Sequence, residues 1–140
     1  MEVSDVRRRL RGAIEQAKRR AAERRTRVDQ ASREYEQFLS AIAVPATQTL
    51  AQALIGEGHR FKVLTPGQAV RLAAEFSPDD YVEISLDADG DAPAVVVHTS
   101  RGRGRRSVET HRTLSGRIGE LTAEDLVTAL LEELIPLIER

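Results

Sequence analysis

The 140-residue chain contains no cysteine and no tryptophan, and its aromatic side chains are limited to two tyrosines and three phenylalanines. Without cysteine there can be no disulfide, no thiolate nucleophile and no Cys-ligated zinc or iron–sulfur site. An absent thiol is compatible with any redox environment, so it does not identify the compartment. A hydrophobic content of 41% over this length allows one core of modest size.

Motifs of common catalytic sites are also missing. The chain has no serine nucleophile elbow, no His-Glu zinc helix and no dinucleotide-binding or P-loop glycine motif. We therefore predict a protein that is not an enzyme and needs no cofactor or metal. An enzyme or small-ligand carrier with a pocket between helices and sheet remains a third alternative, because the 22 Asp and Glu residues supply acid–base groups that no motif marks.

Signals for export or membrane insertion are not found either. The N-terminus lacks the apolar segment of a signal peptide, and no run approaches the 18 or more apolar residues of a membrane span. The expected location is the cytoplasm, without membrane contact. Arginine greatly outnumbers lysine and alanine is abundant, a composition associated with GC-rich bacterial genes.

Proline is absent from the first part of the chain, and the only glycine between Val3 and Ile42 is Gly12. Apolar residues recur there at alternating spacings of three and four, which predicts one long helix with a coiled-coil seam. At about 1.5 Å per residue this helix spans roughly 60 Å, whereas the remaining residues form a globule about 30 Å across. We therefore predict two parts: a helical oligomerisation arm, residues 1–44, and a body, residues 45–140.

Part of the seam must be covered by another helix, most simply that of a second copy of the chain. We predict a homodimer, and a helix folded back as a hairpin is the alternative. Large apolar residues from Tyr35 to Ile42 indicate that this end of the helix also enters the core of the body. The candidate dimer seam consists of Leu10, Ile14, Ala17, Ala21, Val28, Tyr35 and Phe38.

The body is predicted to be α+β. Pro45 should end or kink the long helix, and a short helix is expected over residues 46–55. Alternating apolar residues then predict an antiparallel β-meander of four to five strands. Residues 66–76 fit either a strand or a helix that begins with a capping box, and the strand is favoured. A C-terminal helix that begins after Thr122 is expected to cover the sheet.

Turn residues divide the predicted strands. Residues 77–80, Ser-Pro-Asp-Asp, are predicted to be a turn, and Asp89-Gly90 is predicted to break the next strand. Alternating carboxylates over Asp87–Asp91 resemble the start of a calcium loop, but Ala92 and His98 stand where that loop requires glycine and glutamate. We therefore expect a simple hairpin turn there.

Charge is unevenly distributed, although the formal net charge is only −1. Residues 1–33 carry 11 Arg or Lys and 5 acidic residues, whereas residues 120–140 carry 6 acidic residues and a single arginine. A basic arm beside an acidic body indicates either a polyanionic partner or docking between copies of the chain. A solvated helix surface is the simpler interpretation.

A second basic cluster consists of arginines interleaved with glycines, at Arg101, Arg103, Arg105 and Arg106. Guanidinium groups on a flexible tip can bind phosphates bidentately. This candidate polyanion-binding site supports an alternative function, nucleic-acid binding by the tip and the basic helix, which we do not favour. The simpler interpretations are a solvated hairpin, or a tip that docks on acidic residues of the same protein.

His98 and His111 are equidistant from the centre of this tip, so they are expected to face each other across the hairpin. A histidine pair with a third ligand can bind zinc, but the spacing offers no third ligand. The leading hypothesis is therefore a small non-enzymatic interaction module that self-associates through its N-terminal helix. Its partner proteins are unknown.

Overall fold

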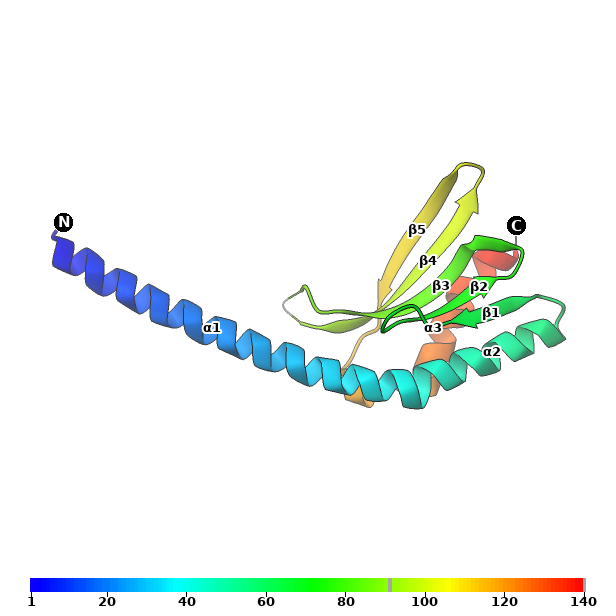
Figure 1. Cartoon of the computed structure of the whole chain (residues 1–140), viewed down its shortest axis with the longest axis horizontal. Helices are drawn as coiled ribbons and strands as arrows, with labels where there is room; N and C mark the ends of the chain where they lie inside the picture. The colour runs from blue at the N-terminus through cyan, green and yellow to red at the C-terminus, as the bar shows by residue number, and fades with distance from the viewer. Residues whose placement is uncertain (91, 140) are drawn as a thin grey trace.

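The computed structural model describes residues 1–90 and 92–139 of the chain. Its α+β architecture is the one predicted: a long N-terminal helix, an antiparallel sheet and a C-terminal helix (Figure 1). The elements are α1 (Val3–Phe38), a π-helical turn η1 (Leu39–Ala43), α2 (Val44–Gly56), β1 (Phe61–Leu64), β2 (Val70–Ala74), β3 (Ser77–Asp87), β4 (Ala94–Arg103), β5 (Arg106–Thr113), a 3₁₀ turn η2 (Ile118–Glu120) and α3 (Ala123–Ile138).

The first three elements form one continuous helix, and Pro45 does not end it. Of the two predicted outcomes, Pro45 accompanies a bend, which is visible between α1 and α2 in Figure 1. Proline lacks an N–H and its ring clashes with the preceding turn of an α-helix. The π turn over Leu39–Ala43 loosens the helix just before Pro45, which stands in the first turn of α2, so the helix continues.

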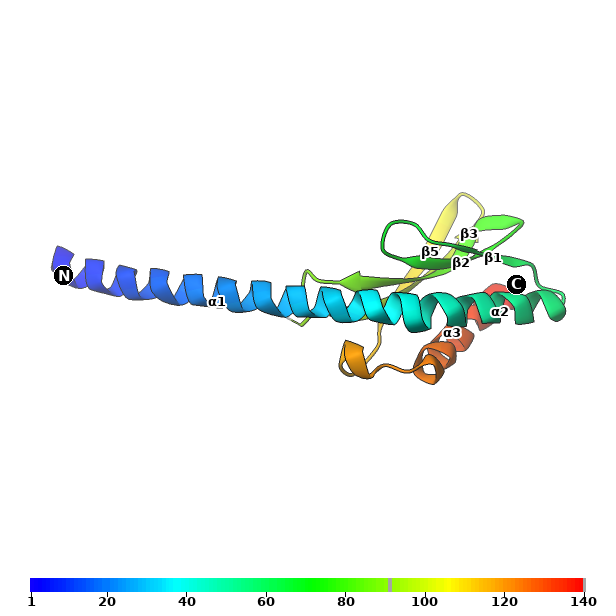
Figure 2. The ribbon, with the colours of Figure 1, turned by 60° about the horizontal axis from the view of Figure 1, so that its bottom comes forward.

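The C-terminal end of α1 enters the core, as predicted. Ala31, Tyr35 and Phe38 are buried, and the two aromatic rings lie 6.5 Å apart between centroids. In contrast, all of residues 1–20 are exposed. Figures 1 and 2 show this N-terminal part projecting from the body as a single helix.

The sheet has five strands in the order β1-β2-β3-β4-β5, and each neighbouring pair is antiparallel, as in a meander. Residues 70–74 form strand β2, which confirms the favoured interpretation of residues 66–76. Val70 and Leu72 are fully buried, whereas Phe76 is 82% exposed. Arg71, between Val70 and Leu72, is only half-buried, so this part of β2 follows the two-residue period of a strand, and Phe76 lies beyond it in the turn to β3.

The predicted turn at residues 77–80 is wrong, because these residues begin β3. Ala74 pairs with Ser77, so the chain reverses two residues earlier, at Glu75-Phe76. A register shift between Ala73 and Ala74 accompanies this reversal. Pro78 is tolerated because the first residues of a strand do not all donate to the ladder.

Helices cover one face of the sheet (Figure 2). The core joins apolar residues of α1, α2 and α3 to alternating residues of the strands, among them Val82, Ile84, Val95 and Val97. α3 begins with the predicted cap: the Asp125 N–H donates to the Thr122 hydroxyl, and the Thr122 N–H donates to the Asp125 carboxylate. Leu126, Leu130 and Leu134 of this helix are fully buried, so α3 covers the sheet as expected.

One stretch of the long helix departs from the expectation about membrane spans. An 18-residue window within Val3–Gly56 has a mean hydropathy of 1.4, enough by length and composition for a membrane crossing. Core helices of folded proteins pass the same test, and 28% of the window is buried inside this protein. Phe38, Ala43 and Ala51 belong to the core. The window is therefore weak evidence for a membrane, and the cytoplasmic location stays a prediction.

Candidate functional site

Of the oligomerisation arm predicted over residues 1–44, only the part of α1 over residues 3–27 projects from the body. From here on, the word arm means residues 3–27 alone. Its predicted seam residues Leu10 and Ile14 are 57% and 45% exposed, and Val6 is 46% exposed. Ala17 is exposed as well, whereas Ala21, and Val28 just beyond the arm, are half-buried. The arm therefore presents an apolar stripe that the described residues of this chain leave open to solvent.

Tyr35 and Phe38 do not belong to a dimer seam, which corrects the prediction for these two residues. They are only 1% and 3% exposed because they pack into the core of their own body. The Tyr35 hydroxyl donates a hydrogen bond to the carbonyl oxygen of Gln68 at 2.6 Å. The carbonyl oxygen of Ile84 is a second, longer acceptor, 3.4 Å from the same hydroxyl. Burial raises the pKa of Tyr35 to about 12, and the negative charge of Glu83 adds to the effect.

The arginine tip lies at the β4–β5 turn. Gly104 and Arg105 form the two-residue turn, with Gly104 at φ +63°, a conformation that favours glycine. Arg103, Arg105 and Arg106 are exposed, and none of them has an ion pair among the described residues. These three guanidinium groups are therefore accessible to a polyanion.

Arg101 differs from the rest of the tip. It is half-buried, and its Nη1 lies 3.5 Å from the carbonyl oxygen of Pro136 in the last turn of α3. A guanidinium group is favoured there because helix C-termini carry unsatisfied carbonyls and partial negative charge. Together with Arg103, Pro136 and Glu139 it lines a small hollow. Arg101 therefore contacts the backbone of α3 within the same molecule, and docking of the tip on acidic residues stays a prediction.

His98 and His111 face each other across the β4–β5 hairpin, as the spacing predicted. They are register partners, and their rings are stacked with centroids 4.4 Å apart and planes inclined by 5°. Nε2 of His98 is buried and makes no hydrogen bond within the described part of the chain, although Oε1 of Glu109 lies 3.5 Å away. Ring nitrogens coordinate a metal in the plane of the ring, so two stacked rings do not converge on one ion.

Around this pair lies a polar row that sequence reasoning missed. Arg71, Glu83, His98 and His111 are successive register partners across β2, β3, β4 and β5. Arg71 binds Glu83 through Nε and Nη2 at 3.0 Å, and its Cζ lies 3.9 Å from the centre of the Tyr81 ring. Strand register brings these residues together, and no local motif signals it.

Metal ligation is not supported by any cluster in the described part of the chain. No group of three or more His, Cys, Asp or Glu residues there could hold a metal ion. Asp87 accepts the Asp89 N–H at 3.0 Å, which is a local turn contact. Asp91, which completes the acidic loop, lies outside the described residues. The absence of a required metal stays a prediction.

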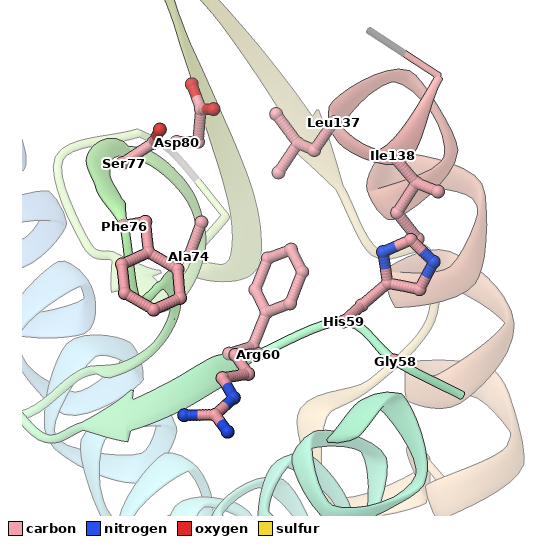
Figure 3. A pocket seen from close by; sticks show the side chains of 10 residues that line it. Gly58, His59, Arg60, Ala74, Phe76, Ser77, Asp80, Leu137 and Ile138 are labelled. Carbon is pink, nitrogen blue, oxygen red and sulfur yellow. The ribbon is translucent and has the colours of Figure 1, made fainter. Parts of the chain in front are cut away.

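A cleft of about 370 Å³ lies between the end of α3 and the β2–β3 turn. In Figure 3, Ser77 and Asp80 stand on one side of the cleft and His59 and Ile138 on the other. Asp80 is only 3% exposed, and its Oδ1 accepts the Gly102 N–H at 2.8 Å, which ties β3 to β4. The cleft offers apolar lining but no recognisable catalytic arrangement.

No family model, no curated protein and no solved structure matches the chain. Function is therefore inferred from the surfaces of the molecule alone.

Proposed function

We propose that this protein is a small, non-enzymatic assembly module that self-associates through its arm. The observation that supports this proposal is the exposure of Val6, Leu10 and Ile14, at 46%, 57% and 45%, on a helix that leaves the body. Most helical stability in proteins comes from packing an apolar face against another element. A second copy supplies that packing in the simplest way.

The proposal is tested by sedimentation of the full chain at micromolar concentration. We expect a dimer or larger species, and we expect Leu10→Asp with Ile14→Asp to shift it to monomer, because a buried unpaired carboxylate is costly. The matched control is Gln16→Asp, which adds a carboxylate on the opposite side of the arm. A compact monomer for the unmodified chain would refute the proposal.

Nucleic-acid binding is the second candidate, supported by the exposure of Arg103, Arg105 and Arg106. Figure 1 shows the β4–β5 tip and the arm pointing away from the body in different directions, so one short duplex would not contact both. We therefore rank this function second. Fluorescence anisotropy with duplex DNA at about 150 mM salt, where surface charges are screened beyond about 8 Å, should show no submicromolar binding.

The proposal includes a cytoplasmic location. It is supported by the partial burial of the apolar window, 28% of which is buried inside this protein. Fractionation of cells that express the protein should recover it without detergent. Recovery only in the membrane fraction would contradict this part of the proposal.

A further inference from the structure

The charges beside the apolar stripe of the arm are almost all of one sign. Arg11 and Lys18 directly follow the seam residues Leu10 and Ala17, and Arg20 and Arg27 directly precede Ala21 and Val28. Arg25 lies on the same flank as Arg11 and Lys18, next to Arg24, which interrupts the apolar seam. These basic residues are all exposed. The acidic residues Glu15 and Glu23 lie on the outer side of the helix, away from the stripe. In a coiled coil, the residues that flank the seam select the partner helix.

These flanks argue against direct pairing of two arms. In a parallel pair, Arg20 of one copy would face Arg25 of the other, and antiparallel pairing also places basic flank against basic flank. Like charges beside the seam oppose association. The arm is therefore complementary to an apolar helix stripe with an acidic flank.

The chain carries such a stripe on the outer side of α3. Leu131, Ile135 and Ile138, at helical spacings of four and three, are 48%, 51% and 37% exposed. Glu132 and Glu139 follow Leu131 and Ile138 along one flank and are both exposed. On this flank Glu132 is already paired with Arg112 of the same chain, so an incoming arginine or lysine would compete with Arg112 for it. Glu139 has no ion pair among the described residues, although it lines a hollow with Arg101 and Arg103, so it is the more open of the two carboxylates.

We infer that the arm of one copy packs on the outer stripe of α3 in a second copy, with one of its basic flanks beside Glu132 and Glu139. This inference rests on the proposed self-association and names the surface that receives the arm. The arm cannot reach its own α3, because it projects away from the body (Figures 1 and 2). Its length of roughly 36 Å exceeds the roughly 24 Å of α3, so it can cover the whole stripe.

Cysteine cross-linking distinguishes the two possible partners of the arm, which are α3 of a second copy and the arm of a second copy. The natural chain has no cysteine, so each introduced thiol is unique. Ile14→Cys and Ile135→Cys proteins, made with different masses, are mixed and treated with a short bismaleimide reagent. We expect the Ile14→Cys chain to be joined to the Ile135→Cys chain. Cross-linking of Ile14→Cys chains to one another would overturn this inference and leave self-association standing, whereas a monomer would remove both.

Charge reversal and salt give a second, independent measurement. Lys18→Glu with Arg25→Glu should weaken association about tenfold or more, and so should Glu132→Lys with Glu139→Lys. Combining all four changes in one chain should restore association. Arg8→Glu with Arg19→Glu changes the charge equally on the outer side of the arm and serves as the control.

Association should also weaken between about 50 mM and about 500 mM salt, because screening reduces attraction between opposite charges. If the arms paired with each other, the same salt increase and the Lys18→Glu/Arg25→Glu change would strengthen association. That result would overturn the inference. Thermal unfolding of each variant shows whether the body remains folded.

Discussion

Residues 3–27 and residues 28–56 belong to one helix of the same chain, but they meet different surroundings. Both segments carry apolar residues at spacings of three and four, yet Leu10 and Ile14 are about half exposed whereas Tyr35 and Phe38 are buried. The second segment lies beside the sheet and α3, and the first has no other element next to it (Figure 1). A seam in the sequence thus shows that a face will be covered, but it does not show whether the same chain or another one covers it.

The largest expected difference between the two segments is in the cost of removing an apolar side chain. Phe38→Ala should lower the free energy of unfolding by about 3–5 kcal/mol, because it leaves a cavity in the core. Leu10→Ala should change it by less than about 0.5 kcal/mol in the monomer. Urea unfolding followed by circular dichroism, at a concentration where sedimentation shows monomer, measures both. Equal effects would contradict the division of the helix.

The next largest effect is a loss of stability at high pH that comes from Tyr35. Its pKa is about 12 in the folded protein and 10.0 without burial, so the unfolded chain releases the proton first. The stabilisation is complete below pH 10 and is lost as the pH rises through about 12, to a total of about 2–3 kcal/mol. Unfolding measured from pH 8 to 11.5 tests this slope.

Tyr35→Phe is the control for that experiment, because it has no proton to release. Its free energy of unfolding should be lower by about 1 kcal/mol at pH 8, from the lost hydrogen bond, and should depend less on pH above 10. The arm contains no tyrosine, so removing charge from the arm should not alter this high-pH behaviour. A variant with the same slope as the natural chain would contradict the assignment to Tyr35.

A smaller difference is expected between two arginine–carboxylate pairs. Arg71→Met should cost about 1 kcal/mol, because Arg71 pairs with half-buried Glu83 and lies over the Tyr81 ring. Arg8→Met should have no measurable effect, since the exposed Arg8–Asp5 contact on the arm is 3.9 Å long. Thermal unfolding of both variants tests the contrast, and a larger loss for Arg8→Met would reverse it.

The smallest effect concerns Gly12, whose absent Cβ would have no neighbour within 4 Å. Gly12→Ala should stabilise the arm helix locally by about 1 kcal/mol, because glycine is a poor helix former. The thermal midpoint of the body should not move, since the arm does not contribute to the core. Helical ellipticity at 222 nm and the unfolding midpoint report the two quantities separately. A shifted midpoint would show that arm and body unfold together.

Several structural features could be predicted from local sequence because their causes are local. The Thr122–Asp125 capping box, the strands with alternating apolar residues and the pairing of His98 opposite His111 all follow from short-range spacing. The turn at Gly104-Arg105 is equally local, since glycine at this position supplies the positive φ. By contrast, the turn at Glu75-Phe76 was misplaced, because Ser-Pro-Asp-Asp is a strong turn signal that strand pairing overrode.

Features that depend on contacts between distant residues could not be predicted. The candidate seam was identified as one continuous set, but only the fold shows that Tyr35 bonds to the Gln68 carbonyl and so belongs to the body. The row from Arg71 to His111 depends on the register of four strands. α3 covers the sheet as expected, but only the fold shows that its apolar residues Leu131, Ile135 and Ile138 stay exposed.

The sequence by itself determined the kinds of elements and their order, because helix periodicity, strand alternation, caps and glycine turns act over a few residues. It also determined that the first helix is too long for the body and that its charge is opposite to that of the C-terminal helix. Only the tertiary structure decided where the seam passes from the core to solvent and which face of α3 stays open. Those outcomes depend on how much of each helix the single sheet can cover, and no local pattern encodes that limit.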